Sequence, residues 1–231
     1  MERFFPRSDG VVLEILYPPY CEVCGIPIPD SFAETHPYCG VCKDSPDKND
    51  PLVRVRAFGK YLFESEYPDD RLSDEIRRLK TDSTIIPLLR ECLYYSMESQ
   101  YPELQELDVV VPVMRGSGDR GYSPVALLAR DIASRYNLPY RDVLYAKEPY
   151  RPMHEIHDLA EKEREIAGKI GCNHQFEGDS ILLIDDTCIN MVTKRECTRV
   201  LKEHGAGEVW ALVLGRMVPR KHFDVLRSYN G

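Results

Sequence analysis

Two pairs of closely spaced cysteines near the start of the chain constrain its local fold more than any other feature. Their pattern is Cys-x2-Cys-x14-Cys-x2-Cys, and its members are Cys21, Cys24, Cys39 and Cys42. Each pair aims two thiolates at one point, and four thiolates suit a closed tetrahedral zinc site. We therefore predict a structural Zn²⁺ module, with Gly25 and Gly40 in the sharp turns that such a module needs.

The alternative interpretation of the four cysteines is a pair of disulfide bonds. The first twenty residues, "MERFFPRSDGVVLEILYPPY", lack the apolar core and small-residue cleavage site of a signal peptide. The chain also has no apolar run long enough to cross a membrane. We therefore expect a cytoplasmic protein without membrane insertion, and a reducing cytoplasm disfavours disulfides.

Composition and length allow one large domain, or a domain with a small module. The chain has 231 residues, of which 43% are hydrophobic and 29% charged, as in ordinary globular proteins. A polar, proline-punctuated stretch, "KDSPDKNDP", predicts a linker. We place the zinc-binding segment at 1–48 and the larger domain at 49–231. The net charge of −8 argues against broad nonspecific nucleic-acid binding but leaves room for a local basic groove.

The larger domain shows alternating strand and helix patterns. "LDVVVPV", "SILLIDD" and "GEVWALVLGR" are short apolar runs typical of buried parallel strands. Helices are expected over about 84–98, from the Ser123-Pro124 pair onward, and over "TKRECTRVLKEHGAG", where Gly205 would end the helix. "LVRVRAFGKYLF" predicts a hairpin or edge strands, and "DVLYAK" a further strand. The alternation predicts an α/β fold with a mostly parallel sheet flanked by helices.

Two adjacent acids end the strand with the strongest pattern. Asp185 and Asp186 would lie at the carboxyl end of the sheet, where ligands of open α/β folds bind. There they can accept hydrogen bonds from ribose hydroxyls or help to hold Mg²⁺. Thr193 and Glu196 have the spacing of a capping box, which would start the next helix and place a phosphate over 188–193. The alternative is an acidic turn that binds nothing.

The loop "RGSGDRG" after the "VVVPV" strand is the second candidate anion site. Its glycines would free backbone N–H groups to form an anion nest, and its arginines would add charge and paired donors. The alternative is a flexible surface loop. The residues assigned to this cradle are Arg115, Gly116, Gly118 and Arg120.

Together these motifs resemble the competence protein F (ComF) family, phosphoribosyltransferase-like proteins with an N-terminal zinc finger. The resemblance rests on the cysteine pairs, "RVRAFGKY" with "IRRLK", "VVVPV" with "RGY" and "LLAR", and "ILLIDD" before a helix, and it covers about 18–216. It implies a type I phosphoribosyltransferase fold. It also implies recognition of phosphoribosyl pyrophosphate (PRPP) with Mg²⁺, and a link in some bacteria to uptake of single-stranded DNA.

The turn after the acids departs from the family pattern. Where the family has a run like Thr-Thr-Gly-Ala-Thr, this chain has Ile-Asn-Met-Val-Thr over 189–193. Met191 replaces a glycine that could take positive φ and let the backbone approach phosphate. We therefore expect weakened phosphate binding, with Asn190 replacing one donor and Thr193 retained. The PRPP-binding residues that the resemblance implies are Asp185, Asp186, Asn190, Thr193, Arg115, Gly116, Gly118 and Arg120.

Two function classes follow. The first is a ComF-like protein that binds PRPP or a related phosphoribosyl ligand and has weak or altered transferase activity. The second is a noncatalytic DNA-uptake accessory that binds single-stranded DNA or a partner protein, using basic residues such as Arg77, Arg78 and Lys80. His154 and His157 could carry protons in a loop over the substrate, although two exposed histidines are the simpler interpretation. No catalytic residue or acceptor substrate is assigned.

Overall fold

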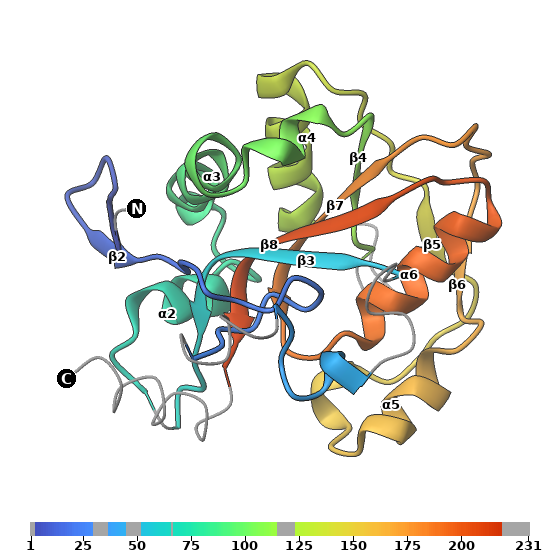
Figure 1. The fold of residues 1–231 in the computed structure, drawn as a ribbon, viewed down its shortest axis with the longest axis horizontal. Coiled ribbons are helices and arrows are strands. Elements are labelled where there is room, and N and C mark those ends of the chain that lie inside the picture. Colours follow the sequence, from blue (N-terminus) through green and yellow to red (C-terminus); the bar gives the residue numbers. More distant parts are fainter. Residues whose placement is uncertain (1–2, 30–36, 45–51, 66, 115–122, 219–231) are drawn as a thin grey trace.

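A parallel four-stranded sheet forms the centre of the protein, as the sequence predicted (Figure 1). The computed structural model describes residues 3–29, 37–44, 52–65, 67–114 and 123–218. The strand order is β3-β8-β7-β4, and all three neighbouring pairs run parallel. These strands are β3 (Arg54–Tyr61), β4 (Val109–Pro112), β7 (Ile181–Cys188) and β8 (Val209–Met217). Their carboxyl ends therefore meet at one edge.

Successive side chains of each strand lie on opposite faces of the sheet and pack into two separate cores. In β7, Leu182 and Ile184 belong to one buried cluster, and Ile181 and Leu183 belong to the other. The first cluster also takes side chains from three helices, and the second takes them from the last helix and a two-stranded ribbon. Because both faces are covered, the central strands are apolar on both sides, which explains their continuous hydrophobic runs.

The helices on the first face are α2 (Arg71–Arg78), α3 (Ile86–Tyr95) and α4 (Pro124–Tyr136). On the second face lie α6 (Val192–Glu203) and the antiparallel ribbon of β5 (Leu144–Ala146) and β6 (Ile170–Cys172), with α5 (Leu159–Ile166) beside α6. A hairpin of β1 (Phe4–Pro6) and β2 (Val12–Glu14) precedes the cysteine pairs. The short helices are at Cys42–Asp44, Ser83–Ile85, Ser96–Gln100, Pro102–Glu106 and Met153–Glu155.

The expected helix ends are mostly observed. The Ser123 hydroxyl accepts a hydrogen bond from the Ala126 amide at 3.4 Å and so caps α4. Gly205 follows α6 with φ +84°, a left-handed conformation that glycine adopts without strain. The predicted 84–98 helix is divided into a single 3₁₀ turn, α3 and a π-helical turn. Pro87 lies in the first turn of α3, where its missing N–H costs nothing.

Two predicted strands lie in unexpected places. β3 is an edge strand paired in parallel with the C-terminal β8, so of the two alternatives the hairpin is wrong. The "DVLYAK" strand exists as β5 but pairs with β6 in its own ribbon. These pairings join residues far apart in the chain, which hydrophobic periodicity does not report.

Among the described residues, none of the helices is both long and apolar enough to span a membrane.

Candidate functional site

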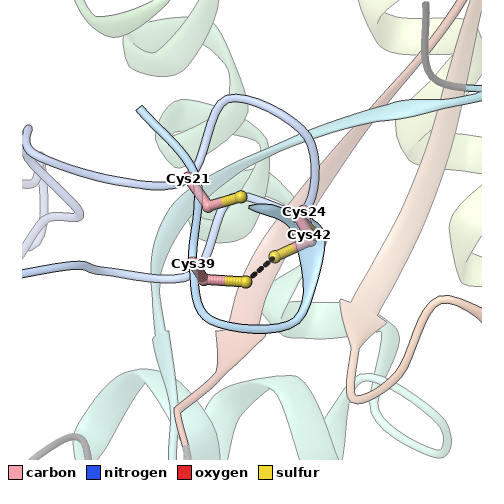
Figure 2. A group of neighbouring side chains, drawn as sticks. All are labelled: Cys21, Cys24, Cys39 and Cys42. Carbon is pink, nitrogen blue, oxygen red and sulfur yellow. Dashed lines mark hydrogen bonds between the residues drawn. The ribbon is translucent and has the colours of Figure 1, made fainter. Parts of the chain in front are cut away.

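The four predicted metal-ligating cysteines form one cluster (Figure 2). Their Sγ atoms all lie within 4.8 Å of one another, and the Cys24 and Cys39 sulfurs are 3.7 Å apart. A tetrahedral ion with Zn–S bonds of about 2.3 Å would hold its sulfurs roughly 3.8 Å apart. All four cysteines are buried and free, so the disulfide alternative is wrong. The cluster therefore has the donor set and spacing that a zinc ion needs.

Of the two glycines predicted in the turns of the zinc module, only one lies where the backbone conformation and the nearby atoms require a glycine. Gly25 has φ +67°, and a Cβ there would lie 2.6 Å from the Val55 carbonyl oxygen. Gly40 has no positive φ, and a Cβ there would meet nothing within 4 Å. Gly40 also lies in a turn, closed by the hydrogen bond from the Lys43 amide to the Cys39 carbonyl oxygen, but that turn would accept a side chain. The close approach of Gly25 to Val55 lets the cysteine module lie directly against strand β3.

A cavity of about 290 Å³ opens at the carboxyl end of the sheet. Four of the eight predicted PRPP-binding residues line it, namely Asp185, Asp186, Asn190 and Thr193. Val113 and Met114, which follow β4, also line it. The remaining predicted residues, Arg115, Gly116, Gly118 and Arg120, lie outside the described residues. The structure thus brings these four residues together in one cavity, and their role in ligand binding stays a prediction.

Asp185 is engaged by a residue that the sequence analysis did not single out. Lys194, in the first turn of α6, is only 4% exposed, and its ammonium group forms an ion pair with the Asp185 carboxylate. The same ammonium donates to the Thr187 carbonyl oxygen. A lysine at a helix N-terminus opposes the helix dipole. Lys194 follows Asp185 by nine residues. Because a lysine is unfavourable at this place, its position in the sequence could have indicated that it has a specific acidic partner.

The ion pair stays charged at neutral pH. Burial raises the pKa of Asp185 to about 6, an effect larger than the opposing attraction of Lys194. Burial alone would lower the pKa of Lys194, but the nearby Asp185 carboxylate raises it above its ordinary value. Both groups therefore remain ionised at pH 7. Within this three-residue set, Lys194 offsets one of the two negative charges of Asp185 and Asp186.

Asp186 remains available to a ligand. Its Oδ1 atom accepts hydrogen bonds from the Thr187 amide at 2.6 Å and the Thr187 hydroxyl at 3.1 Å. In the described part of the chain, no hydrogen bond reaches the other oxygen of this carboxylate. The acid pair is thus divided between a structural carboxylate, Asp185, and a ligand-accessible one, Asp186.

The turn between the acids and α6 does not need a glycine. Met191 has φ −83° and ψ −3°, an ordinary right-handed conformation, and it is the residue just before the helix. Met191 therefore fits this turn without positive φ, and the expected weakening of phosphate binding stays a prediction. The side-chain oxygen of Asn190 accepts from the Val192 amide at 3.2 Å, which stabilises the start of the helix.

The predicted capping box is also wrong. Thr193 lies inside the first turn of α6, after Val192, and the residue at the N-cap position is Met191, whose side chain makes no capping hydrogen bond. The Glu196 carboxylate instead accepts from the Gly168 amide at 2.8 Å and binds Arg199. Because Glu196 is drawn to a distant loop, Thr193 is not fixed as a cap and its side chain lines the cavity.

Other side chains complete the cavity wall. His154 lines it and is exposed, whereas His157 is exposed and is not among its lining residues. Their role as proton carriers stays a prediction. Tyr150 is half-buried there, and burial raises its pKa to about 12, which keeps the phenol neutral at physiological pH. The lining thus combines an aromatic ring and apolar groups with three lysines, Lys80, Lys162 and Lys194.

No family model matches the chain, and no curated protein matches it significantly. Among solved structures, the chain is similar to adenine phosphoribosyltransferase from Saccharomyces cerevisiae, at 13% identity over 66% of this chain and 76% of that one, with a TM-score of 0.36. It is similar to the Trypanosoma brucei adenine phosphoribosyltransferase bound to AMP, pyrophosphate and ribose-5-phosphate, at 14% identity over 64% and 71%, with a TM-score of 0.34.

A longer protein is also similar to part of the chain. Glutamine PRPP amidotransferase from B. subtilis is 21% identical over 67% of this chain and 31% of that one, with a TM-score of 0.35. An allosteric regulatory enzyme of purine biosynthesis is matched over only 22% of its length, at 21% identity over 46% of this chain with a TM-score of 0.30. The fold class of this protein follows from its strand order and parallel pairing.

Proposed function

We propose that this protein binds PRPP or a related phosphoribosyl ligand in the cavity at the carboxyl end of β7. The observation that carries this proposal is the convergence of Asp186, Asn190 and Thr193, with Asp185, on one cavity. The ribose hydroxyls would donate to Asp186, which keeps one carboxylate oxygen free of hydrogen bonds within the described structure. The phosphate would lie at the start of α6, where the helix dipole and Thr193 favour an anion.

The charges of the cavity suit a ligand with both hydroxyl and phosphate groups. Lys194 offsets the charge of Asp185, and Lys80 and Lys162 add two further positive charges to the wall. The predicted cradle over Arg115 to Arg120 would hold the pyrophosphate. Mg²⁺ bound with PRPP would neutralise part of the pyrophosphate charge, and Asp186 is the lining carboxylate still available to such an ion.

We further propose that any transferase activity is weak or altered. A phosphoribosyl transfer needs the ribose and the leaving pyrophosphate held in place, and electrostatic stabilisation where charge develops. With Asp185 engaged by Lys194, only one of the two acids is left to hold the ribose. Turnover would therefore depend on orientation by Asp186 and the helix start.

The noncatalytic alternative has less support in the structure. Two of the basic residues assigned to it form ion pairs, since Arg78 lies 2.8 Å from Asp82 and Arg77 lies 3.7 Å from Glu64. The third, Lys80, lines the ligand cavity. Neutralised arginines are weak candidates for contacts with the phosphates of single-stranded DNA.

Titration calorimetry with PRPP and MgCl₂ tests the proposed function. The zinc-loaded protein should bind PRPP, and Asp186→Asn should weaken binding by roughly tenfold or more, because a charged hydrogen-bond acceptor is lost. Asp69→Asn, an exposed acid outside the cavity, is the matched control and should bind as the unmodified protein does. No heat of binding at millimolar PRPP would refute the proposal.

A further inference from the structure

A single buried arginine joins the cysteine module to the turn at the ligand cavity. Arg216 lies near the end of β8 and is 5% exposed. Its Nε donates to the Cys24 carbonyl oxygen at 2.7 Å. One of its terminal nitrogens donates to the carbonyl oxygens of Cys188 at 2.6 Å and Ile189 at 3.0 Å. One rigid guanidinium group therefore fixes the backbone of the first cysteine pair relative to the start of the ligand turn, which we define as 188–191.

A second contact joins the same two parts. The Met191 side chain packs against the buried cluster of the cysteine module, which includes all four cysteines. It also packs against the core on the α6 face of the sheet. Its sulfur lies 3.8 Å from the Cys188 sulfur, within the ligand turn. The residue that replaces the expected glycine is thus wedged between the metal module and the domain core.

The charge of Arg216 points to a loaded metal site. Within the described ranges, the hydrogen bonds of Arg216 go to backbone carbonyl oxygens and no carboxylate forms an ion pair with it, so its buried positive charge has no acidic partner there. Burying a lone cation is costly. Four thiolates around one Zn²⁺ carry a net charge of −2, and metal binding keeps them deprotonated. The metal-loaded cluster would therefore supply the counter-charge that Arg216 lacks.

We propose that the metal-loaded cysteine module positions the ligand turn through Arg216 and Met191, so that metal occupancy sets the affinity of the cavity for its ligand. Arg216 is a positioning residue, because it holds the carbonyl groups of Cys188 and Ile189 without lining the cavity itself. In this chain the cysteine module would hold the backbone of the ligand turn in place, as a glycine-rich turn does by its own conformation. The part of this inference that concerns ligand affinity rests on the proposed function.

Hydrogen exchange tests the coupling without any ligand. Amides of 188–193 should exchange at least about tenfold faster in zinc-stripped protein than in zinc-loaded protein, because loss of the module frees the turn to open. Arg216→Lys keeps the charge but cannot fork between the carbonyl groups, and it should show the same acceleration with zinc still bound by metal analysis. Arg54→Lys, an arginine on β3 that pairs with Glu208, is the matched control and should leave 188–193 unchanged.

Variants of Met191 test the coupling separately, in case Arg216→Lys does not fold. Met191→Ala removes the apolar contact and leaves Arg216 in place, so it should accelerate exchange in the turn while amides of α4 keep their protection. Met191→Leu should restore most of that protection, because it refills the same space. Unchanged exchange of 188–193 in stripped protein, Arg216→Lys and Met191→Ala would overturn the proposal.

Ligand binding separates this proposal from the proposed function. PRPP affinity should fall by roughly tenfold on zinc removal and return on adding Zn²⁺, and by linkage PRPP should slow zinc transfer to a chelator. Equal affinity of loaded and stripped protein would overturn the coupling. Absence of PRPP binding to loaded, unmodified protein would instead refute the proposed function, and hydrogen exchange would still decide whether the module positions the turn.

Discussion

Lys194 and Asp185 form a buried ion pair in the wall of the cavity at the carboxyl end of the sheet, and they lie on either side of the turn between β7 and α6. The pair joins the end of β7 to the start of α6, so it fixes the spacing between the two elements that would hold the ribose and the phosphate. It also distinguishes the roles of the two adjacent acids. Asp185 joins β7 to α6, and Asp186 has one carboxylate oxygen that no hydrogen bond reaches within the described structure.

Removing the lysine should destabilise the protein strongly. In Lys194→Met the Asp185 carboxylate would be left buried without a partner, which typically costs about 3–5 kcal/mol. Lys202→Met, on the exposed part of the same helix, should change the free energy of unfolding by less than about 0.5 kcal/mol. Chemical denaturation at pH 7 measures both. A loss below about 1 kcal/mol in Lys194→Met would show that the pair does not stabilise the fold.

The stability of the protein should depend on pH through Asp185. Its folded-state pKa of about 6 lies above the ordinary value of 3.8, so the folded protein binds more protons than the unfolded chain between those values. This group's contribution to stability is therefore fully present below about pH 4 and is lost as the pH rises through 6. The difference in unfolding free energy between the unmodified protein and Asp185→Asn should fall from pH 4 to pH 6. A flat or rising difference would contradict the raised pKa.

Glycine at position 191 should weaken the protein rather than repair it. Met191 already has a right-handed backbone, so Met191→Gly relieves no strain and removes a contact with the cysteine module. We expect a loss of about 1–2 kcal/mol in unfolding free energy. This value lies at or below the low end for a methionine truncation, because Met191 is only half-buried. PRPP binding should also become weaker. Denaturation and calorimetry provide the two values. Tighter PRPP binding would show instead that the methionine obstructs the phosphate.

Metal content tests the cysteine cluster directly. Protein purified without chelator should carry close to one zinc per chain, and Cys39→Ser should lower zinc retention sharply, because a hydroxyl is a poor replacement for a thiolate ligand. Cys92→Ser changes a buried cysteine that belongs to the core on the α2, α3 and α4 face and not to the cysteine cluster, and this variant should keep its zinc. Metal analysis after gel filtration gives the stoichiometry. Zinc-free protein with a fully folded module would contradict the assignment.

The sequence predicted the elements that depend on local pattern. The apolar run of β7, its terminal acids and the cysteine spacing identified residues that the structure brings together in one cavity and in one four-cysteine cluster. The capping box failed because Glu196 is drawn to the Gly168 amide, a tertiary contact that outweighs the local motif. The family pattern, which has glycine where this chain has Met191, did not show that the backbone there is right-handed.

Long-range contacts account for the rest. Arg216 reaches Cys24 across 192 positions of the chain, and the two β3 alternatives could be separated only by its pairing with β8. Neither contact leaves a periodic signal in the sequence. The ion pair of Lys194 could have been inferred from the sequence. A lysine in the first turn of a helix opposes the helix dipole, so an acidic partner is expected to offset that unfavourable effect.

Amide chemical-shift mapping by NMR tests the central claim most directly, since it locates the ligand as well as detecting it. PRPP and MgCl₂ would be titrated into zinc-loaded, isotope-labelled protein. The account predicts saturable shifts clustered on 185–194, with Asp186→Asn reducing them and Asp69→Asn leaving them intact. Saturable shifts that leave 185–194 unaffected, or no shifts at millimolar PRPP, would contradict it.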